Sequence, residues 1–118
     1  MAQFSEALLD HFRNPRNSGE LADATHRAEM TNPVCGDVLR LAARVENGKI
    51  AEVRFLCRGC TTAIASASVL SERMRGMTVE EARWITAEWI SESLGGLPTE
   101  TFHGAHLAAD AAKLLLKK

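Results

Sequence analysis

The stretch Ala51–Leu70, AEVRFLCRGCTTAIASASVL, changes its pattern half-way along. Up to Cys57, apolar residues alternate with mostly polar ones, which is the period of a half-buried β-strand. After Cys60 the residues are small, which is typical of a closely packed helix. Cys60 is therefore expected at or beside the N-terminus of this helix, where unpaired amides and the helix dipole stabilise a thiolate. We expect the pKa of its thiol to be lowered.

A second alternating run, residues 39–46, precedes this strand and predicts its hairpin partner. Residues 46–48, Glu-Asn-Gly, offer the turn between the two strands. Both apolar faces lie on the same side only if paired residues have matching parity, so we expect an odd, three-residue loop. This register places Cys57 opposite Asp37.

The rest of the chain predicts one weaker strand, near residues 20–30, and several helices. An amphipathic helix precedes that strand and stops at Asn14-Pro15. Later helices are predicted up to Arg75, from a capping box at Thr78–Glu81, from Thr86, and over residues 101–117. Strands first and helices later predict an α+β fold, in which a small antiparallel three-stranded sheet packs against several helices. We expect a two-layer single domain spanning residues 1–118.

The three cysteines of the chain are placed where a thiolate would be exposed and able to bind a metal. Cys35 lies in Asn32–Asp37, whose proline and glycine predict a turn. Cys57 and Cys60 form a Cys-x-x-Cys pair. No thioredoxin-like order of strands and helices surrounds this pair, which argues against a redox dithiol. The cysteines thus indicate a metal site.

Four motifs, in the same order, resemble those of the IscU/NifU-type iron-sulfur cluster scaffold family. They are an N-terminal segment from Phe4 to Asn17, Asn-Pro-Val-Cys-Gly-Asp at residues 32–37, Gly-Cys followed by Ala-Ile-Ala-Ser-x-Ser at residues 59–68, and Leu97-Pro98 with a late His and Leu-Ala-x-Asp-Ala. The resemblance extends from Phe4 to Leu115. It implies a scaffold, not an enzyme, that takes sulfur from a cysteine desulfurase, obtains iron from a donor, holds a labile [2Fe-2S] cluster and passes it to apo-proteins.

The chain departs from the family pattern in two places. Where the family usually has His-Cys-Ser, the chain has His103-Gly104-Ala105, so the third family cysteine, the expected sulfur acceptor, is absent. Where the family has Leu-Pro-Pro-x-Lys, residues 97–101 lack the second proline and the lysine. Recognition by an Hsp70-type chaperone is therefore expected to be weakened.

The extra cysteine suggests how the site could be completed. In the predicted hairpin, Cys57 lies beside the Asp37 turn and close to Cys60. His103 and His106 are spaced i and i+3 near the start of the last predicted helix, on one face. We therefore expect the ligands to be Cys35, Cys57, Cys60 and His103, with Asp37 or His106 as substitutes. An equally good interpretation of Cys57 is a small core residue at the end of an apolar strand face.

This donor set leaves two kinds of occupant open. Thiolates and an imidazole suit either tetrahedral zinc or the iron of a [2Fe-2S] cluster. The first alternative function is a zinc-binding, SufU-like sulfur acceptor that receives sulfur on Cys60 or Cys57. That branch is expected to carry an added stretch between the second and third cysteine motifs, which is not evident here. The second is a degenerate homologue that regulates or sequesters a desulfurase.

Composition limits the other possibilities. The formal net charge of the 118-residue chain is −1, and no basic stripe is interleaved with aromatic residues, so nucleic acid is not an expected partner. No run approaches the roughly 20 apolar residues of a membrane-spanning helix. The odd number of cysteines and the lack of a secretory signal favour a reducing cytoplasm.

Overall fold

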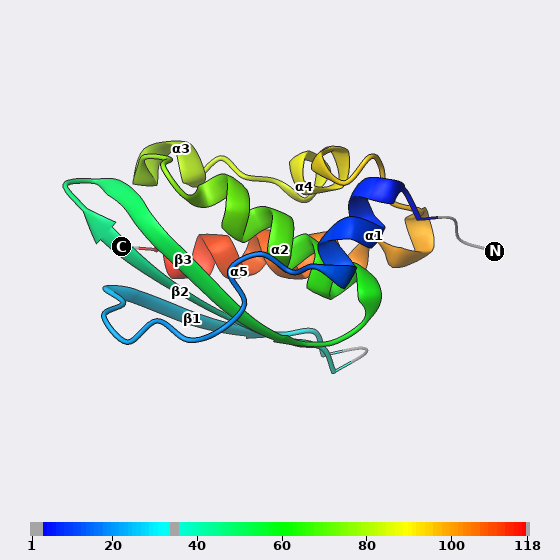
Figure 1. The fold of residues 1–118 in the computed structure, drawn as a ribbon, viewed down its shortest axis with the longest axis horizontal. Coiled ribbons are helices and arrows are strands. Elements are labelled where there is room, and N and C mark those ends of the chain that lie inside the picture. Colours follow the sequence, from blue (N-terminus) through cyan, green and yellow to red (C-terminus); the bar gives the residue numbers. More distant parts are fainter. Residues whose placement is uncertain (1–3, 34–35, 118) are drawn as a thin grey trace.

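The computed structural model describes residues 4–33 and 36–117. Three antiparallel strands form one sheet in the order β1-β2-β3, and helices lie against it (Figure 1). The elements are α1 (Glu6–Arg13), β1 (His26–Thr31), β2 (Val38–Glu46), β3 (Lys49–Arg58), α2 (Thr61–Met74), α3 (Val79–Ala82), α4 (Ala87–Ser93), the 3-10 helix η1 (Thr99–Thr101) and α5 (His103–Leu115). The predicted α+β fold with a three-stranded sheet is confirmed.

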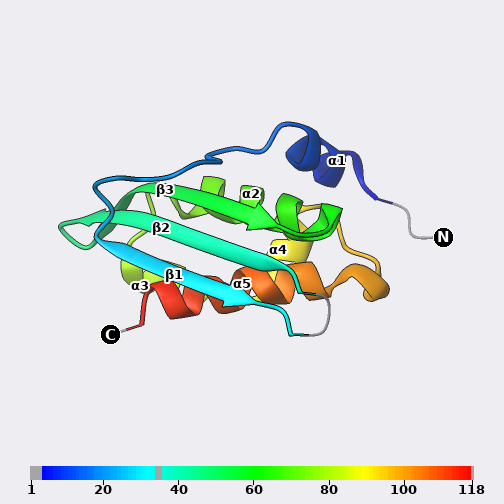
Figure 2. The same ribbon diagram turned by 90° about the horizontal axis from the view of Figure 1, so that it is seen from below.

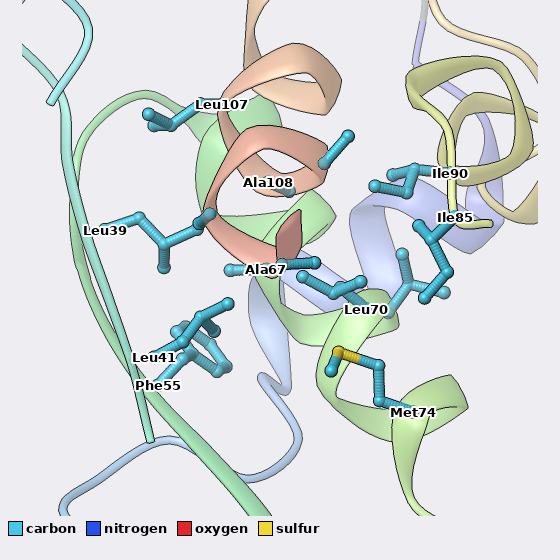
Figure 3. Close-up of a cluster of buried hydrophobic side chains, with 14 of the residues drawn as sticks. Leu39, Leu41, Phe55, Ala67, Leu70, Met74, Ile85, Ile90, Leu107 and Ala108 are labelled. Atoms are coloured by element: carbon cyan, nitrogen blue, oxygen red, sulfur yellow. The ribbon is translucent and has the colours of Figure 1, made fainter. Parts of the chain in front are cut away.

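The sheet is covered on one face by the two longest helices (Figures 1 and 2). α2 packs against β3, and α5 packs against β1 and β2. α4 lies on the far side of this helix pair, and α1 packs against α2. Figure 3 shows the core between the layers, where side chains from the sheet meet those of the helices: Leu39, Leu41 and Phe55 on one side, and Ala67, Leu70, Leu107 and Ala108 on the other.

The small residues of α2 allow this close packing. Ala63, Ala65 and Ala67 are at most 1% exposed, so both the sheet and the other helices approach the backbone of α2. Each buried alanine also loses little side-chain entropy on folding, which keeps the helix favourable. Because α5 likewise contributes buried alanines, the two helices lie close together over the sheet.

Hydroxyl side chains cap the starts of three helices, two of them at the predicted residues Thr78 and Thr86. Ser5, Thr78 and Thr86 accept backbone N–H groups at the starts of α1, α3 and α4, and the capping box of α3 is complete. β1 begins at His26, later than the prediction, because the preceding residues form a turn closed by Ala24 N–H and the Leu21 carbonyl. No helix of the described part of the chain is long and apolar enough to cross a membrane.

The turn between β2 and β3 differs from the prediction. Its loop is the pair Asn47 and Gly48, with φ angles of 53° and 77°, because Glu46 pairs directly with Lys49. Two successive positive φ angles match the right-handed twist of a hairpin. The even loop does not turn one apolar face outward, because the ladder shifts its register by one residue between Val45 and Arg44.

The observed register places different residues at the end of the hairpin. Beyond the irregularity, Leu39 pairs with Cys57 and Val38 pairs with Arg58. The predicted pairing of Asp37 with Cys57 is therefore wrong by two residues. Continuing the same ladder, Asp37 comes level with Gly59, and this shift decides which groups meet at the site.

Candidate metal centre between the sheet and two helices

Three segments meet at one end of the molecule, opposite the hairpin turn of β2 and β3 (Figures 1 and 2). They are the loop that leads into β2, the corner where β3 turns into α2, and the start of α5. Each carries one side chain that can bind a metal: Asp37, Cys60 and His103. The ligand atoms of these three residues all lie within 4.8 Å of one another.

Cys60 is the N-cap residue of α2, as predicted, with an extended backbone conformation that separates β3 from the helix. The residue as a whole is exposed, although its thiol is partly buried beside Asp37 and the start of α2. The expected decrease of its pKa is wrong. Partial burial of the thiol raises its pKa and Asp37 adds to the increase, whereas the Ala63 and Thr62 amides lower it by less. The helix start therefore does not outweigh burial and Asp37 in setting the direction of the pKa shift.

Asp37 supplies the buried oxygen of the group. The residue is 7% exposed, and its Oδ2 atom has no hydrogen-bond partner within the described part of the chain. A buried carboxylate oxygen without a partner costs about 1–3 kcal/mol or more, and a bound cation would remove that cost. The backbone carbonyl of Asp37 accepts a hydrogen bond from the Asn32 N–H at 2.8 Å.

His103, the first residue of α5, completes the group. Its Nε2 atom lies 3.4 Å from the Cys60 sulfur and 3.9 Å from Asp37 Oδ2. Donor atoms around a tetrahedral zinc ion are separated by about 3.5 Å, given metal–ligand bonds of about 2.0–2.3 Å. The two separations from His103 are near this spacing, and the carboxylate oxygen without a hydrogen-bond partner lies on the same side of the group, so the three residues are a candidate metal centre.

Two of the predicted ligands do not join this group. Cys57 is half-buried, packs against the core on the inner face of β3, and is opposite Leu39. Burial, followed by the nearby charges of Asp37 and Cys60, raises the pKa of Cys57 to about 12, so its thiol is protonated at neutral pH. His106 is exposed and its ring meets the edge of Phe102, with the ring centroids 5.2 Å apart. Cys35 lies outside the described residues.

Gly59 contributes to the site in a way that the sequence did not reveal. A Cβ atom at this position would lie 2.8 Å from Cγ of Asp37, so the missing side chain makes room for the carboxylate. The signal was a glycine near the end of a strand, which often marks a close approach of another group. Without the register, its partner could not be named.

Comparison with known proteins places the chain in a family. The sequence model of the NifU-like N terminal domain matches residues 3–118. The chain belongs to this family. Relatives confirm the assignment made from the four motifs, and they are iron-sulfur cluster assembly scaffold proteins by name.

Two relatives and one solved structure illustrate the similarity. IscU 1 of Archaeoglobus fulgidus is 42% identical over 110 residues, which are 93% of this chain and 72% of the relative. IscU of Azotobacter vinelandii is 42% identical over 119 residues, covering 97% of this chain and 91% of the relative. A putative SUF-system scaffold from Fervidobacterium islandicum superposes with a TM-score of 0.78 at 23% identity, covering 97% and 96% of the two chains. This last similarity confirms the fold.

Proposed function

We propose that the chain is an iron-sulfur cluster assembly scaffold, not an enzyme, that binds iron and sulfide at this site, builds a labile [2Fe-2S] cluster and transfers it to apo-proteins. The observation that carries the proposal is the convergence of Cys60, Asp37 and His103 at the donor spacing of a metal centre. It occurs in a chain of the NifU-like family whose relatives are named scaffolds.

The exposure of the donors suits a cargo that must leave. Cys60 is exposed and the His103 side chain is 37% exposed, so a partner can reach both. Asp37 offers a hard oxygen to a soft cluster, and such a ligand is more easily replaced than a thiolate. A site of this kind holds its cargo without enclosing it.

Four residues form the ligand set of this proposal. Cys60, Asp37 and His103 are the three that the geometry supports, and Cys35 is proposed as the fourth because the family motif places it two residues before Asp37. We leave Cys57 and His106 out of the set. The position of Cys57 in the core and its raised pKa favour the packing interpretation.

The partners follow from the same reading. A cysteine desulfurase would deliver sulfane sulfur to a thiolate of the site, which becomes a persulfide while the desulfurase cysteine leaves as a thiolate. Reduction of the persulfide to sulfide then requires two electrons from an external reductant. Apo iron-sulfur proteins would receive the finished cluster. An Hsp70-type chaperone is a weaker candidate because of the altered Leu97-Pro98 motif, and the cytoplasm is the proposed compartment.

A zinc-binding sulfur acceptor, as in the SufU-like alternative, is the second candidate function. The observation that favours it is the spacing of 3.4 and 3.9 Å from His103 Nε2 to the other two donors, which suits one tetrahedral ion. In that case zinc would hold the thiolates until a desulfurase delivers sulfur. Cys60 is the acceptor that the geometry favours, because it is exposed and Cys57 is not.

Anaerobic reconstitution separates the two. The purified protein is incubated with ferrous iron, cysteine and a desulfurase, and visible absorption is recorded together with iron, sulfide and zinc content. A [2Fe-2S] chromophore that moves to an apo-ferredoxin, and that is lost in Cys60→Ser, supports the scaffold. Stoichiometric zinc without a chromophore supports the sulfur acceptor. If the wild type shows neither a chromophore nor stoichiometric zinc, and Cys60→Ser behaves like the wild type, both functions are contradicted.

A further inference from the structure

Gly104 directly follows the ligand His103 and faces the first turn of α2. A Cβ atom at this position would lie 2.8 Å from the Ala63 nitrogen, 2.8 Å from the Thr62 carbonyl carbon and 2.9 Å from Thr62 Cγ2. Non-bonded carbon atoms are normally about 3.5–4.0 Å apart. Two of these three neighbours are backbone atoms of a helix, which cannot rotate away as the end of a side chain can. A side chain at position 104 would therefore force α5 and α2 to move apart.

Backbone conformation does not explain this glycine. Gly104 is not among the residues with a positive φ angle, and it lies in regular helix. In a helix without close neighbours, alanine is more favourable than glycine. Space alone therefore requires glycine here, and the space is what brings the two helix starts together.

We propose that Gly104 is a positioning residue of the metal centre, which sets the distance between His103 and Cys60 by letting the first turn of α5 lie on the first turn of α2. Cys60 caps α2 and His103 begins α5, so the separation of the two helix starts is also the separation of the two ligands. The observed 3.4 Å contact depends on that separation. The inference rests on the ligand set of the proposed function.

The same packing determines what a cysteine at position 104 would do to the site. The family's third cysteine corresponds to Gly104, and a thiol there would meet the backbone of Thr62 and Ala63. α5 could make room only by moving, and its next turns are anchored by Ala105 and Ala108, which are both fully buried. A cysteine at position 104 would thus separate His103 from Cys60 instead of adding a third thiolate to an intact site.

The test uses Co²⁺, whose charge-transfer and d–d absorption report on thiolate ligation and tetrahedral geometry. For Gly104→Ala we expect Co²⁺ binding to weaken about tenfold or more, as when a residue that orients a ligand is removed, with weaker d–d bands and a lower melting temperature. Gly104→Cys should also bind Co²⁺ more weakly than the wild type. If Gly104→Ala alone does not fold, the measurement is made on Gly104→Ala with Thr62→Ser, which removes the 2.9 Å contact.

Two controls keep the outcomes distinct. Ala112→Gly loosens the same helix at a residue that is 1% exposed and far from its start, so the melting temperature should fall while the Co²⁺ affinity and spectrum stay unchanged. His103→Ala should lose affinity with little change in melting temperature. Unchanged Co²⁺ binding in His103→Ala would refute the ligand set of the proposed function. Loss in His103→Ala together with wild-type affinity in Gly104→Ala, or tighter binding in Gly104→Cys, would overturn the role of Gly104 alone.

Discussion

The imidazole of His103 lies 3.4 Å from the sulfur of Cys60, across 43 residues of sequence. Each residue stands at the start of its own helix, and the two helices pack side by side on one face of the sheet. Small side chains in α2 and α5 bring the helices this close, so the packing of the core determines the geometry of the ligands.

Zinc bound at the proposed site should stabilise the protein against unfolding, because the proposed ligands are brought together only in the folded state. At a free zinc concentration of 100 times Kd, the free energy of unfolding should rise by about 2.7 kcal/mol. Thermal unfolding with zinc and with EDTA measures this difference. Cys60→Ser should lose most of it, and His106→Gln, at an exposed position outside the group, should keep it. Equal loss in both variants would argue against the proposed ligands.

Asp37→Ala should separate stability from metal binding. Removing a buried carboxylate oxygen that has no partner in the described structure should raise the free energy of unfolding of the metal-free protein by about 1 kcal/mol. The same change should weaken zinc binding. Urea unfolding without metal and competition titration with zinc provide the two values. Asp110→Ala, on an exposed position of α5, is the matched control and should change neither. A less stable metal-free Asp37→Ala protein with unchanged zinc affinity would contradict this role.

The free cysteines should differ in their reactivity. At pH 8, a thiol with a pKa of about 12 is ionised in only about one molecule in 10⁴, so Cys57 should be alkylated slowly by iodoacetamide. Cys60 is exposed whereas Cys57 is half-buried, so Cys60 should react first of the two. Peptide mass spectrometry after timed alkylation measures both rates.

The same alkylation is then repeated in the presence of zinc. Zinc should protect Cys60 and leave the slow rate of Cys57 unchanged. Cys57→Ser should retain zinc, in contrast to Cys60→Ser. Protection of Cys57 by zinc, or loss of zinc in Cys57→Ser, would return Cys57 to the ligand set.

The stability of the protein should decrease in mild acid because of His11. This residue is 7% exposed, its Nδ1 atom is 2.8 Å from Ser68 Oγ, and its Nε2 atom is 3.6 Å from Glu72. Burial, together with the charge of Arg16, lowers its pKa in the folded state, although Glu72 and Asp10 act in the opposite direction. Below the ordinary histidine pKa of about 6.5, the unfolded chain therefore binds the proton more readily than the folded one.

The expected pH profile follows from this difference. The contribution of His11 is complete above about pH 6.5 and is lost as the pH falls toward the lower pKa of the folded state. Urea unfolding between pH 7.5 and 5 gives the slope of the free energy of unfolding against pH, which should correspond to the uptake of roughly one proton at most. His11→Asn should flatten this part of the profile, whereas His106→Gln, which changes an exposed histidine, should leave it unaltered. An unchanged slope in His11→Asn would assign the effect to other groups.

Strand periodicity predicted the faces of the hairpin but could not fix its register. Side chains alternate with a period of two, so two registers that differ by two residues bury the same apolar face. A three-residue loop and the observed two-residue loop with an irregular ladder are such a pair. The predicted register has Asp37 opposite Cys57, whereas the observed register has Leu39 there. Cys57 therefore packs in the core, and Asp37 lies beside Gly59.

The site shows the same division between local and distant information. Cys60 at the start of a helix follows from the local sequence, and so does the proximity of His103 to a helix start. The upward shift in the pKa of Cys60 depends on burial and on Asp37, which come from other segments. The need for glycine at position 104 likewise depends on how near α2 lies, which no local pattern encodes.

The three proposed ligand residues lie far apart in the sequence, on the loop before β2, on the corner after β3 and at the start of α5. A metal ion or cluster bound to Asp37, Cys60 and His103 would act as a cross-link that closes two large loops of chain, one of them between Cys60 and His103, which are 43 positions apart. Loading would restrain the relative motion of the sheet, α2 and α5, and unloading would release it. The empty and loaded forms would then present different flexibility at one end of the molecule, which a partner could use to tell them apart.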